Sequence, residues 1–256
     1  MGYELRGVDR TAVITGAGSL RGIGRATASA LAEGGWHVAV LDIDESSAEQ
    51  RAQEMTRDRG VSALGVGCDV SDAEQVATAV SIVESRLPPV GALVNNAGIA
   101  SPTRFLDVTD AEWDRILEVN VRGSYLMTKR LAPGMAERGF GRIVNVSSVA
   151  AERGGGVFGG VAYSTAKAAL LGFSRALARE LGPSNVTVNA VAPGLVDTDI
   201  TAELAPERER AVIDDLPMRR KGTVDDVADV IAFLCRPESS YVTGSTYDIN
   251  GGLHIH

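Results

Sequence analysis

A glycine-rich segment between a short apolar run and a helix-forming run constrains the fold of this chain more than any other feature. Residues 11–15 are apolar or β-branched and predict a buried strand. Residues 16–24 contain four glycines, and residues 25–32 favour a helix. A glycine turn that opens a helix presents free N–H groups and the positive end of the helix dipole. The segment therefore predicts a site for a phosphate group.

The same alternation of strand and helix continues along the chain, and it predicts a parallel sheet covered on both faces. We expect an α/β fold of the Rossmann type, with one doubly wound domain over residues 1–256 and a seven-stranded parallel sheet, because no low-complexity linker or repeat interrupts the pattern. The strands are expected at 11–15, 37–41, 63–68, 91–95, 142–147, 186–191 and 245–249. Capping boxes are expected for Ser46 with Glu49, Ser71 with Glu74, and Thr109 with Glu112.

An acidic residue ends the second predicted strand. Asp42 lies 18 residues beyond Gly24, which is close to the spacing of a carboxylate that binds the adenosine ribose hydroxyls. Such a carboxylate also repels the 2′-phosphate of NADP, so Asp42 favours NAD. Two observations leave alternatives open: Asp42 could cap the strand end, and Arg21 could reach a 2′-phosphate.

A tyrosine and a lysine four residues apart, Tyr163 and Lys167, lie in a run that predicts a helix. At this spacing they share one face of the helix. A free tyrosine has a pKa near ~10, and a nearby lysine cation lowers it toward the range useful for proton transfer. The spacing also occurs by chance on solvated helix faces, so its meaning depends on the other motifs of the chain.

Together these motifs resemble the short-chain dehydrogenase/reductase family over nearly the whole chain. The family's T-G-x-x-x-G-x-G loop is matched at Thr15, Gly16, Gly22 and Gly24, although this loop is two residues longer, naturally read as Leu20-Arg21. Residues 95–98 match its N-N-A-G segment, and residues 68–70 resemble the segment whose Asp contacts the adenine.

The resemblance implies a catalytic tetrad of Asn120, Ser148, Tyr163 and Lys167. Ser148 is favoured over the adjacent Ser147 by the alignment of the preceding strand, and the segment that joins Ser148 to Tyr163 is longer than is common. In the implied mechanism Tyr163 donates a proton to a carbonyl oxygen while Lys167 lowers the tyrosine pKa and holds the ribose. Ser148 stabilises charge on the substrate oxygen. Asn120 would hold a water that relays protons toward Lys167.

The resemblance also implies a cofactor site and a substrate lid. Residues 193–198 would cover the nicotinamide, and residues from about 195 to 222 would close over the substrate and set specificity, unless that region is a simple surface helical hairpin. The implied cofactor-binding residues are Gly16, Ser19, Arg21, Gly22, Ile23, Gly24, Asp42, Ile43, Asp69, Val70, Asn96, Ala97, Gly98, Tyr163, Lys167, Pro193, Gly194, Val196 and Thr198.

Composition narrows the class of partner. A net charge of −8 and a pI near 5.0 argue against general binding of nucleic acid or anionic membranes. Cys68 and Cys235 are too few for a disulfide framework and predict buried free thiols. No apolar run approaches the ~18 residues of a membrane span, so a cytoplasmic protein is expected. No metal is expected at His254 and His256, and a homotetramer is implied by analogy.

We therefore predict an oxidoreductase that transfers a hydride between NAD(H) and a secondary alcohol or ketone, such as a sugar or polyol. NADP is the less favoured cofactor. The alternative substrate is a 3-oxoacyl thioester, for which Arg104, Lys129 and Arg130 could dock a carrier protein. A catalytically silent cofactor sensor is the other class, and such a protein would be expected to lack the tyrosine, lysine or serine that this chain keeps.

Overall fold

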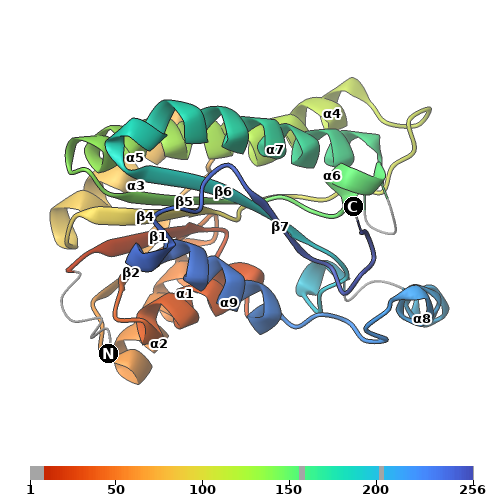
Figure 1. Cartoon of the computed structure of the whole chain (residues 1–256), viewed down its shortest axis with the longest axis horizontal. Coiled ribbons are helices and arrows are strands. Elements are labelled where there is room, and N and C mark those ends of the chain that lie inside the picture. The colour runs from red at the N-terminus through yellow and green to blue at the C-terminus, as the bar shows by residue number, and fades with distance from the viewer. Residues whose placement is uncertain (1–8, 156–158, 202–204, 256) are drawn as a thin grey trace.

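A seven-stranded parallel sheet forms the centre of the computed structural model, which describes residues 9–155, 159–201 and 205–255 (Figure 1). Its strand order is β3-β2-β1-β4-β5-β6-β7, which confirms the predicted doubly wound Rossmann-type sheet. Each strand lies within two residues of its predicted position. The strands are β1 (Thr11–Thr15), β2 (His37–Asp42), β3 (Ala63–Gly67), β4 (Val90–Asn95), β5 (Gly141–Val146), β6 (Val186–Pro193) and β7 (Thr246–Ile249).

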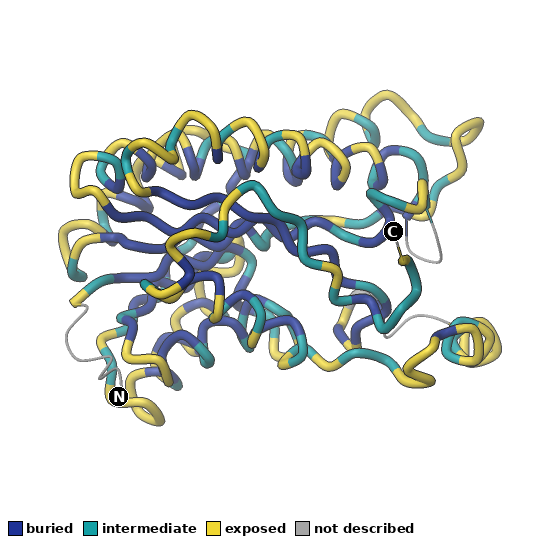
Figure 2. The backbone as a smooth tube through the Cα atoms, in the orientation of Figure 1, coloured by how far each residue is buried: buried dark blue, intermediate teal, exposed yellow. Residues whose placement is uncertain are grey.

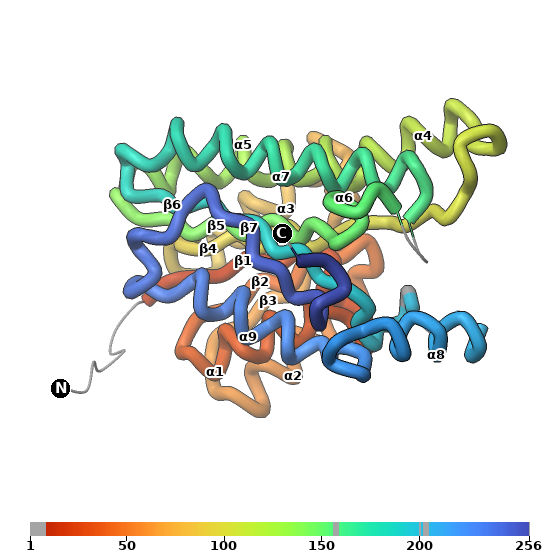
Figure 3. Tube along the Cα trace, turned by 45° about the vertical axis from the view of Figure 1, so that its right-hand side comes forward, coloured from red at the N-terminus to blue at the C-terminus, as the bar shows by residue number. Residues whose placement is uncertain are grey.

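Helices cover both faces of the sheet (Figure 1). One layer contains α1 (Ile23–Glu33), α2 (Glu45–Arg59) and α9 (Val224–Cys235), and the other contains α3 (Ala73–Arg86), α4 (Asp110–Leu117), α5 (Gly123–Glu137) and α7 (Val161–Leu181). The short helices α6 (Ala150–Arg153) and α8 (Pro206–Asp215) follow β5 and β6. Figures 1 and 3 show α8 projecting beyond the layer of α1, α2 and α9. Short turns η1 (Glu118–Arg122), η2 (Gly182–Ser184), η3 (Asp199–Thr201) and η4 (Pro237–Ser239) complete the described elements.

Two apolar clusters sandwich the sheet. Ala12 and Ile14 of β1 pack in the cluster with α1 and α9, whereas Val13 packs in the cluster with α3 and α5. All five β1 residues are buried, which explains why the strand sequences are apolar without alternation (Figure 2). Cys68 and Cys235 are buried and unpaired, as predicted.

Two of the three predicted helix caps are wrong by one or two residues. Helix α2 begins after Asp44, which accepts from the Ser47 N–H, and α3 begins after Asp72, which accepts from the N–H groups of Glu74 and Gln75. In both places a carboxylate takes the capping position instead of the nearby serine, Ser46 or Ser71, and its negative charge also suits the helix dipole. Thr109 caps α4 as predicted by accepting from the Glu112 N–H.

The predicted lid contains one short turn and one helix, η3 and α8, within its described part; residues 202–204 lie outside the described residues. The longer segment that joins Ser148 to Tyr163 is described except for residues 156–158. The strand order reverses between β1 and β4, so a crevice is expected at the carboxyl ends of these strands, which is where doubly wound folds bind ligands.

Candidate active site

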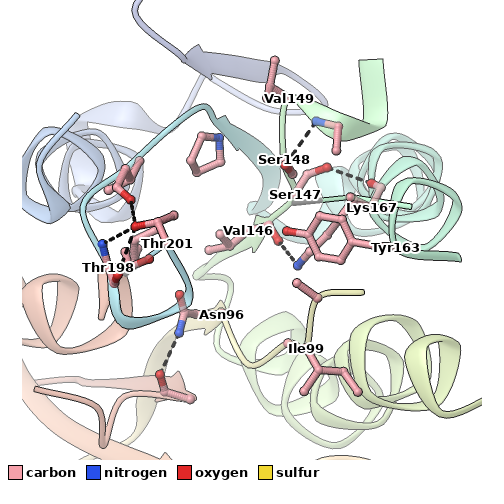
Figure 4. Close-up of a pocket in the computed structure, with 18 of the residues that line it drawn as sticks. Asn96, Ile99, Val146, Ser147, Ser148, Val149, Tyr163, Lys167, Thr198 and Thr201 are labelled. Carbon is pink, nitrogen blue, oxygen red and sulfur yellow. Dashed lines mark hydrogen bonds between the residues drawn. The ribbon is translucent and has the colours of Figure 1, made fainter. Parts of the chain in front are cut away.

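A cavity of about 1170 Å³ opens at the carboxyl ends of the strands. It contains most of the residues that the sequence predicted for the site. Those that line it are Gly16, Ser19, Gly22, Ile23, Asp42, Ile43, Asp69, Val70, Asn96, Ala97, Gly98, Ser148, Tyr163, Lys167, Pro193, Gly194, Val196 and Thr198. Figure 4 shows Ser148, Tyr163 and Lys167 on one side of it and Thr198 and Thr201 on the other.

Three predicted residues do not line the cavity. Gly24 packs α1 against the loop, because a Cβ there would stand 2.6 Å from the Gly16 carbonyl oxygen. Arg21 was expected to contact the cofactor, but its guanidinium instead lies 2.8 Å from the Asp197 carboxylate. Asn120 lies behind the cavity wall in η1.

The glycine loop is fixed to the end of β4 by a dense set of hydrogen bonds. The Thr15 hydroxyl accepts from the N–H groups of Asn96 and Ala97 at 3.1 and 3.0 Å. The Asn96 amide donates to the carbonyls of Thr15 and Gly16 at 2.9 and 2.8 Å. Gly16 has φ +63°, and a Cβ there would lie 2.7 Å from the Ala97 Cα, so only glycine fits. The N-N-A-G segment therefore supports the floor of the loop.

Asp42, at the end of β2, contacts the glycine loop and keeps lone pairs that could accept from a ligand. Its Oδ2 accepts from the Gly18 N–H at 2.8 Å and its Oδ1 accepts from the Asp44 N–H at 3.2 Å. Each carboxylate oxygen has two lone pairs, so one remains on each for a ligand hydroxyl. A Cβ on Gly18 would approach the Asp42 carboxyl carbon to 2.9 Å, which explains the glycine at this position.

The phenol of Tyr163 and the hydroxyl of Ser148 are hydrogen-bonded side by side at the cavity wall. Ser148 also accepts from the Ala150 N–H at 3.1 Å. The neighbouring Ser147 is buried and donates to the Lys167 carbonyl at 2.7 Å, so its hydroxyl is committed to holding α7 against β5 (Figure 4). The structure thus places Ser148, rather than Ser147, beside the phenol.

Burial shifts the pKa values of both Tyr163 and Lys167. Burial raises the pKa of Tyr163, and the hydrogen bond with Ser148 offsets only part of that rise. The Lys167 Nζ lies 5.6 Å from the centre of the tyrosine ring and donates to the Val146 carbonyl at 2.8 Å. Burial lowers the pKa of Lys167 to about 8, so this lysine loses its positive charge at a lower pH than a free lysine does. Burial is therefore the largest influence on the Tyr163 pKa in this structure, and the lowering of that pKa by Lys167 stays a prediction.

Asn120 lies in a π-helical turn between α4 and α5. Its Nδ2 donates to the carbonyls of Ile99 and Ile116, both at 2.9 Å. Its Oδ1 is buried and has no hydrogen-bond partner among the described residues. A Cβ built on Gly98 would stand 2.5 Å from this oxygen and 3.2 Å from the Lys167 Nζ, so the two polar groups converge on the glycine. Single π-helical turns often occur at functional sites.

Several residues of the site escaped the sequence reasoning. Arg153 of α6 and Arg208 of α8 line the cavity, and although both lie in segments expected near the substrate, neither arginine was predicted as a site residue. Asn145 of β5 does not line the cavity but links β4 to α7, since it accepts from the Asn95 Nδ2 and donates to the Ser174 hydroxyl, both at 2.8 Å. A polar residue in the middle of an apolar strand was the available signal for Asn145.

The residues present fit a nicotinamide dinucleotide. The glycine cradle accepts a phosphate at the start of α1, Asp42 offers acceptors for ribose hydroxyls, and the Tyr163–Ser148 pair lies in the same cavity. Within the described ranges there is no group of three side chains suited to a metal ion. Among the described helices, none is both long and apolar enough to cross a bilayer.

Comparison with known proteins agrees with this geometry. The family model described as enoyl-(acyl carrier protein) reductase matches residues 16–254. An uncharacterized short-chain type dehydrogenase/reductase of Sinorhizobium fredii is 44% identical over 96% of this chain and 98% of its own length. The 3-oxoacyl-[acyl-carrier-protein] reductase of Aquifex aeolicus is 39% identical over 98% of this chain and 99% of its own length.

Two solved structures are also similar to this chain. A 3-oxoacyl-[acyl-carrier protein] reductase with bound NAD from Brucella melitensis superposes with a TM-score of 0.89 at 35% identity, covering 97% of this chain and 92% of that one. A putative gluconate dehydrogenase from Agrobacterium tumefaciens superposes with a TM-score of 0.90 at 31% identity, covering 96% and 97%.

Proposed function

This chain belongs to the short-chain dehydrogenase/reductase family, and from that premise we propose that it is an NAD(H)-linked oxidoreductase that reduces a 3-oxoacyl thioester to the 3-hydroxyacyl thioester. The observation that carries the reaction class is the Tyr163–Ser148 pair in a cavity that also contains the glycine cradle and Asp42. The nicotinamide, when bound, supplies or accepts the hydride.

Each member of the tetrad has a role that its position supports. Tyr163 donates the proton to the substrate oxygen, because a phenol is protonated at neutral pH and its hydroxyl lies at the cavity wall. Ser148 donates a hydrogen bond to the same oxygen as charge develops there. Lys167 holds ribose hydroxyls, and the unpartnered Asn120 oxygen next to Gly98 orients a water that returns protons toward Lys167.

Two observations support NAD over NADP. The Asp42 carboxylate lines the cavity, and its charge would oppose a 2′-phosphate. Arg21, the cation best placed in the sequence to attract that phosphate, is paired with Asp197. The solved 3-oxoacyl-[acyl-carrier protein] reductase of Brucella melitensis holds NAD, which agrees with this preference.

The walls of the substrate half favour an acyl chain. Apolar side chains from five separate segments line this half of the cavity, while Arg153 and Arg208 provide positive charge in the same lining. An acyl thioester has an apolar chain for such walls and, in its carrier portion, phosphate groups for the two arginines. The residues of this lining are Ile99, Ala100, Val149, Leu195, Ala211, Val212 and Leu253.

A substrate panel tests this function. The enzyme is assayed with NADH and then NADPH against acetoacetyl-CoA, and with NAD against polyols and sugar acids. We expect NADH oxidation with the thioester and weaker activity with NADPH. Activity confined to the polyols and sugar acids would refute the acyl proposal while leaving the oxidoreductase intact.

Oxidation of a sugar or polyol is the second candidate. It is favoured by the similarity to a putative gluconate dehydrogenase and by Asp42, because NAD is the cofactor that suits oxidation. The apolar side chains that line the cavity from five segments suit an acyl chain better than several hydroxyls, so we rank it second.

We also propose a homotetramer. Tyr241 before β7 is fully exposed, Phe233 of α9 is 42% exposed, and Tyr125 of α5 is 48% exposed, and these are apolar rings on faces that have no covering element within the described chain. Light scattering of the purified protein checks this; a monomer at micromolar concentration would refute it.

A further inference from the structure

Four charged side chains from three segments form one continuous series of ion pairs beside the cavity. The Arg21 Nη2 lies 2.8 Å from Asp197 Oδ1, and the Lys221 Nζ lies 3.2 Å from the same oxygen. Lys221 also pairs with Glu209 of α8 at 2.5 Å. We call Arg21, Asp197, Lys221 and Glu209 the ionic clasp. It ties the glycine loop to the segment after β6 and to helix α8.

A hydrogen bond at the cavity lining joins the same two segments as the Arg21–Asp197 ion pair. The Ser19 hydroxyl donates to Asp199 Oδ2 at 2.5 Å, and both residues line the cavity. Ser19 belongs to the glycine loop, where the phosphate site is expected, and Asp199 follows Thr198, so this hydrogen bond joins the glycine loop to the segment after β6. A dinucleotide bound on the glycine loop would therefore lie beside this hydrogen bond and beside the ionic clasp.

The base of the clasp is fixed by backbone pairing that does not depend on Arg21. The Asp197 N–H donates to the Gly222 carbonyl at 2.9 Å, and the Gly222 N–H donates to the Leu195 carbonyl at 2.9 Å. These bonds hold Asp197 close to Lys221. Arg21 supplies the charged link to the glycine loop, and it is one of the two residues by which this loop exceeds the common pattern of the family.

On the proposed function, in which a nicotinamide dinucleotide binds on the glycine loop, we propose that the ionic clasp closes over the bound cofactor and slows its release. Arg21 is then a positioning residue that acts through Asp197, and the longer glycine loop is what brings it within reach of the segment after β6. Because Glu209 lies on α8, the same ion pairs connect cofactor retention to the predicted substrate lid.

The strength of the clasp suits a contact that opens in every turnover. Arg21 and Asp197 are both about half exposed, with side-chain exposures of 52% and 47%. An exposed pair of this kind changes an equilibrium by up to about fivefold and is weakened by salt. Hydrogen bonds from Lys221 and Arg21 hold the pKa of Asp197 below its usual range, so its charge persists at neutral pH.

A simpler role for Arg21 predicts a different pattern. If Arg21 only attracted the anionic cofactor, removing the negative charge of Asp197 would strengthen cofactor binding. If the clasp retains the cofactor, loss of either Arg21 or Asp197 accelerates release. The sign of the Asp197 effect therefore separates the two roles.

The test measures NADH dissociation by stopped-flow fluorescence for the wild type, Arg21→Ala, Asp197→Asn and the double variant, at low and high salt. We expect about two- to fivefold faster release in both single variants, no further change in the double variant, and loss of the salt dependence of release. Arg130→Ala is the matched control, because Arg130 pairs with Glu84 at 3.5 Å and similar exposure, and neither residue lines the cavity.

Two results would overturn the clasp. Release from Arg21→Ala at the rate of Arg130→Ala, or slower release from Asp197→Asn, would refute it while leaving the proposed function standing. Failure of the wild type to bind either NADH or NADPH would refute the proposed function, and the clasp with it. Equal thermal unfolding midpoints across the variants exclude a folding defect.

Discussion

Replacing Asp42 by asparagine should reduce the preference for NADH over NADPH without disturbing the loop. Asparagine keeps an oxygen that can accept from the Gly18 N–H, which Asp42 Oδ2 does at 2.8 Å, and it loses only the longer bond of 3.2 Å from the Asp44 N–H. What changes is the charge that faces the ribose. Asp42→Asn therefore separates the electrostatic part of cofactor choice from the structural part.

The magnitude follows from two terms. Hydrogen bonds to a charged acceptor exceed neutral ones by about 1 kcal/mol each, so NADH loses roughly 1–2 kcal/mol through its ribose hydroxyls. A carboxylate near a 2′-phosphate in a partly exposed site costs about 1–3 kcal/mol, which NADPH regains. The two effects act in opposite directions on the two cofactors, so the preference falls by about 3 kcal/mol, or roughly a hundredfold.

The assay is a titration of NADH and NADPH fluorescence against the wild type and Asp42→Asn at one ionic strength. A wild type that binds NADPH as tightly as NADH would refute the reasoning, as would equal weakening of both cofactors in the variant. Asp44→Asn is the control, because Asp44 lies two residues after Asp42, caps α2 and does not line the cavity.

Three further predictions follow from the same geometry. Gly16→Ala should destabilise the protein by about 1–3 kcal/mol more than Gly35→Ala, because both have positive φ but only Gly16 faces backbone within 3 Å; chemical denaturation measures the difference. Lys167→Met should be more stable than the wild type at neutral pH. The difference in unfolding free energy between the two should shrink by about 3 kcal/mol as the pH rises from about 8 to 10.5, since the folded lysine loses its proton before the unfolded one. A difference that is constant with pH would contradict the lowered pKa. Asn145→Leu should cost about 2–4 kcal/mol of unfolding free energy, because the Asn95 amide and the Ser174 hydroxyl lose a buried partner.

Most of the fold was predictable because its signals are local. The β1 strand, the glycine turn and the start of α1 follow one another in the sequence, and burial on both faces makes the strands apolar throughout. Helix caps were less predictable, since Asp44 and Asp72 compete with neighbouring serines for the same role and only the backbone geometry decides between them.

The candidate site was predictable where the residues sit on one element and not where they meet across elements. Tyr163 and Lys167 share α7, so their spacing could be seen in the sequence, but the effect of burial on both pKa values depends on the packing around them. Arg21 and Asp197 are 176 residues apart, and no local pattern links them. The same is true of Arg153 and Arg208, which the topology brings to one cavity.

The Tyr163→Phe variant tests whether Tyr163 performs the proton transfer in this cavity. The variant keeps the ring and loses the hydroxyl, so NADH should bind as in the wild type while turnover of acetoacetyl-CoA falls by about a hundred- to ten-thousandfold. Tyr125→Phe, an exposed tyrosine on α5, should leave turnover unchanged. Wild-type turnover in Tyr163→Phe would contradict the account.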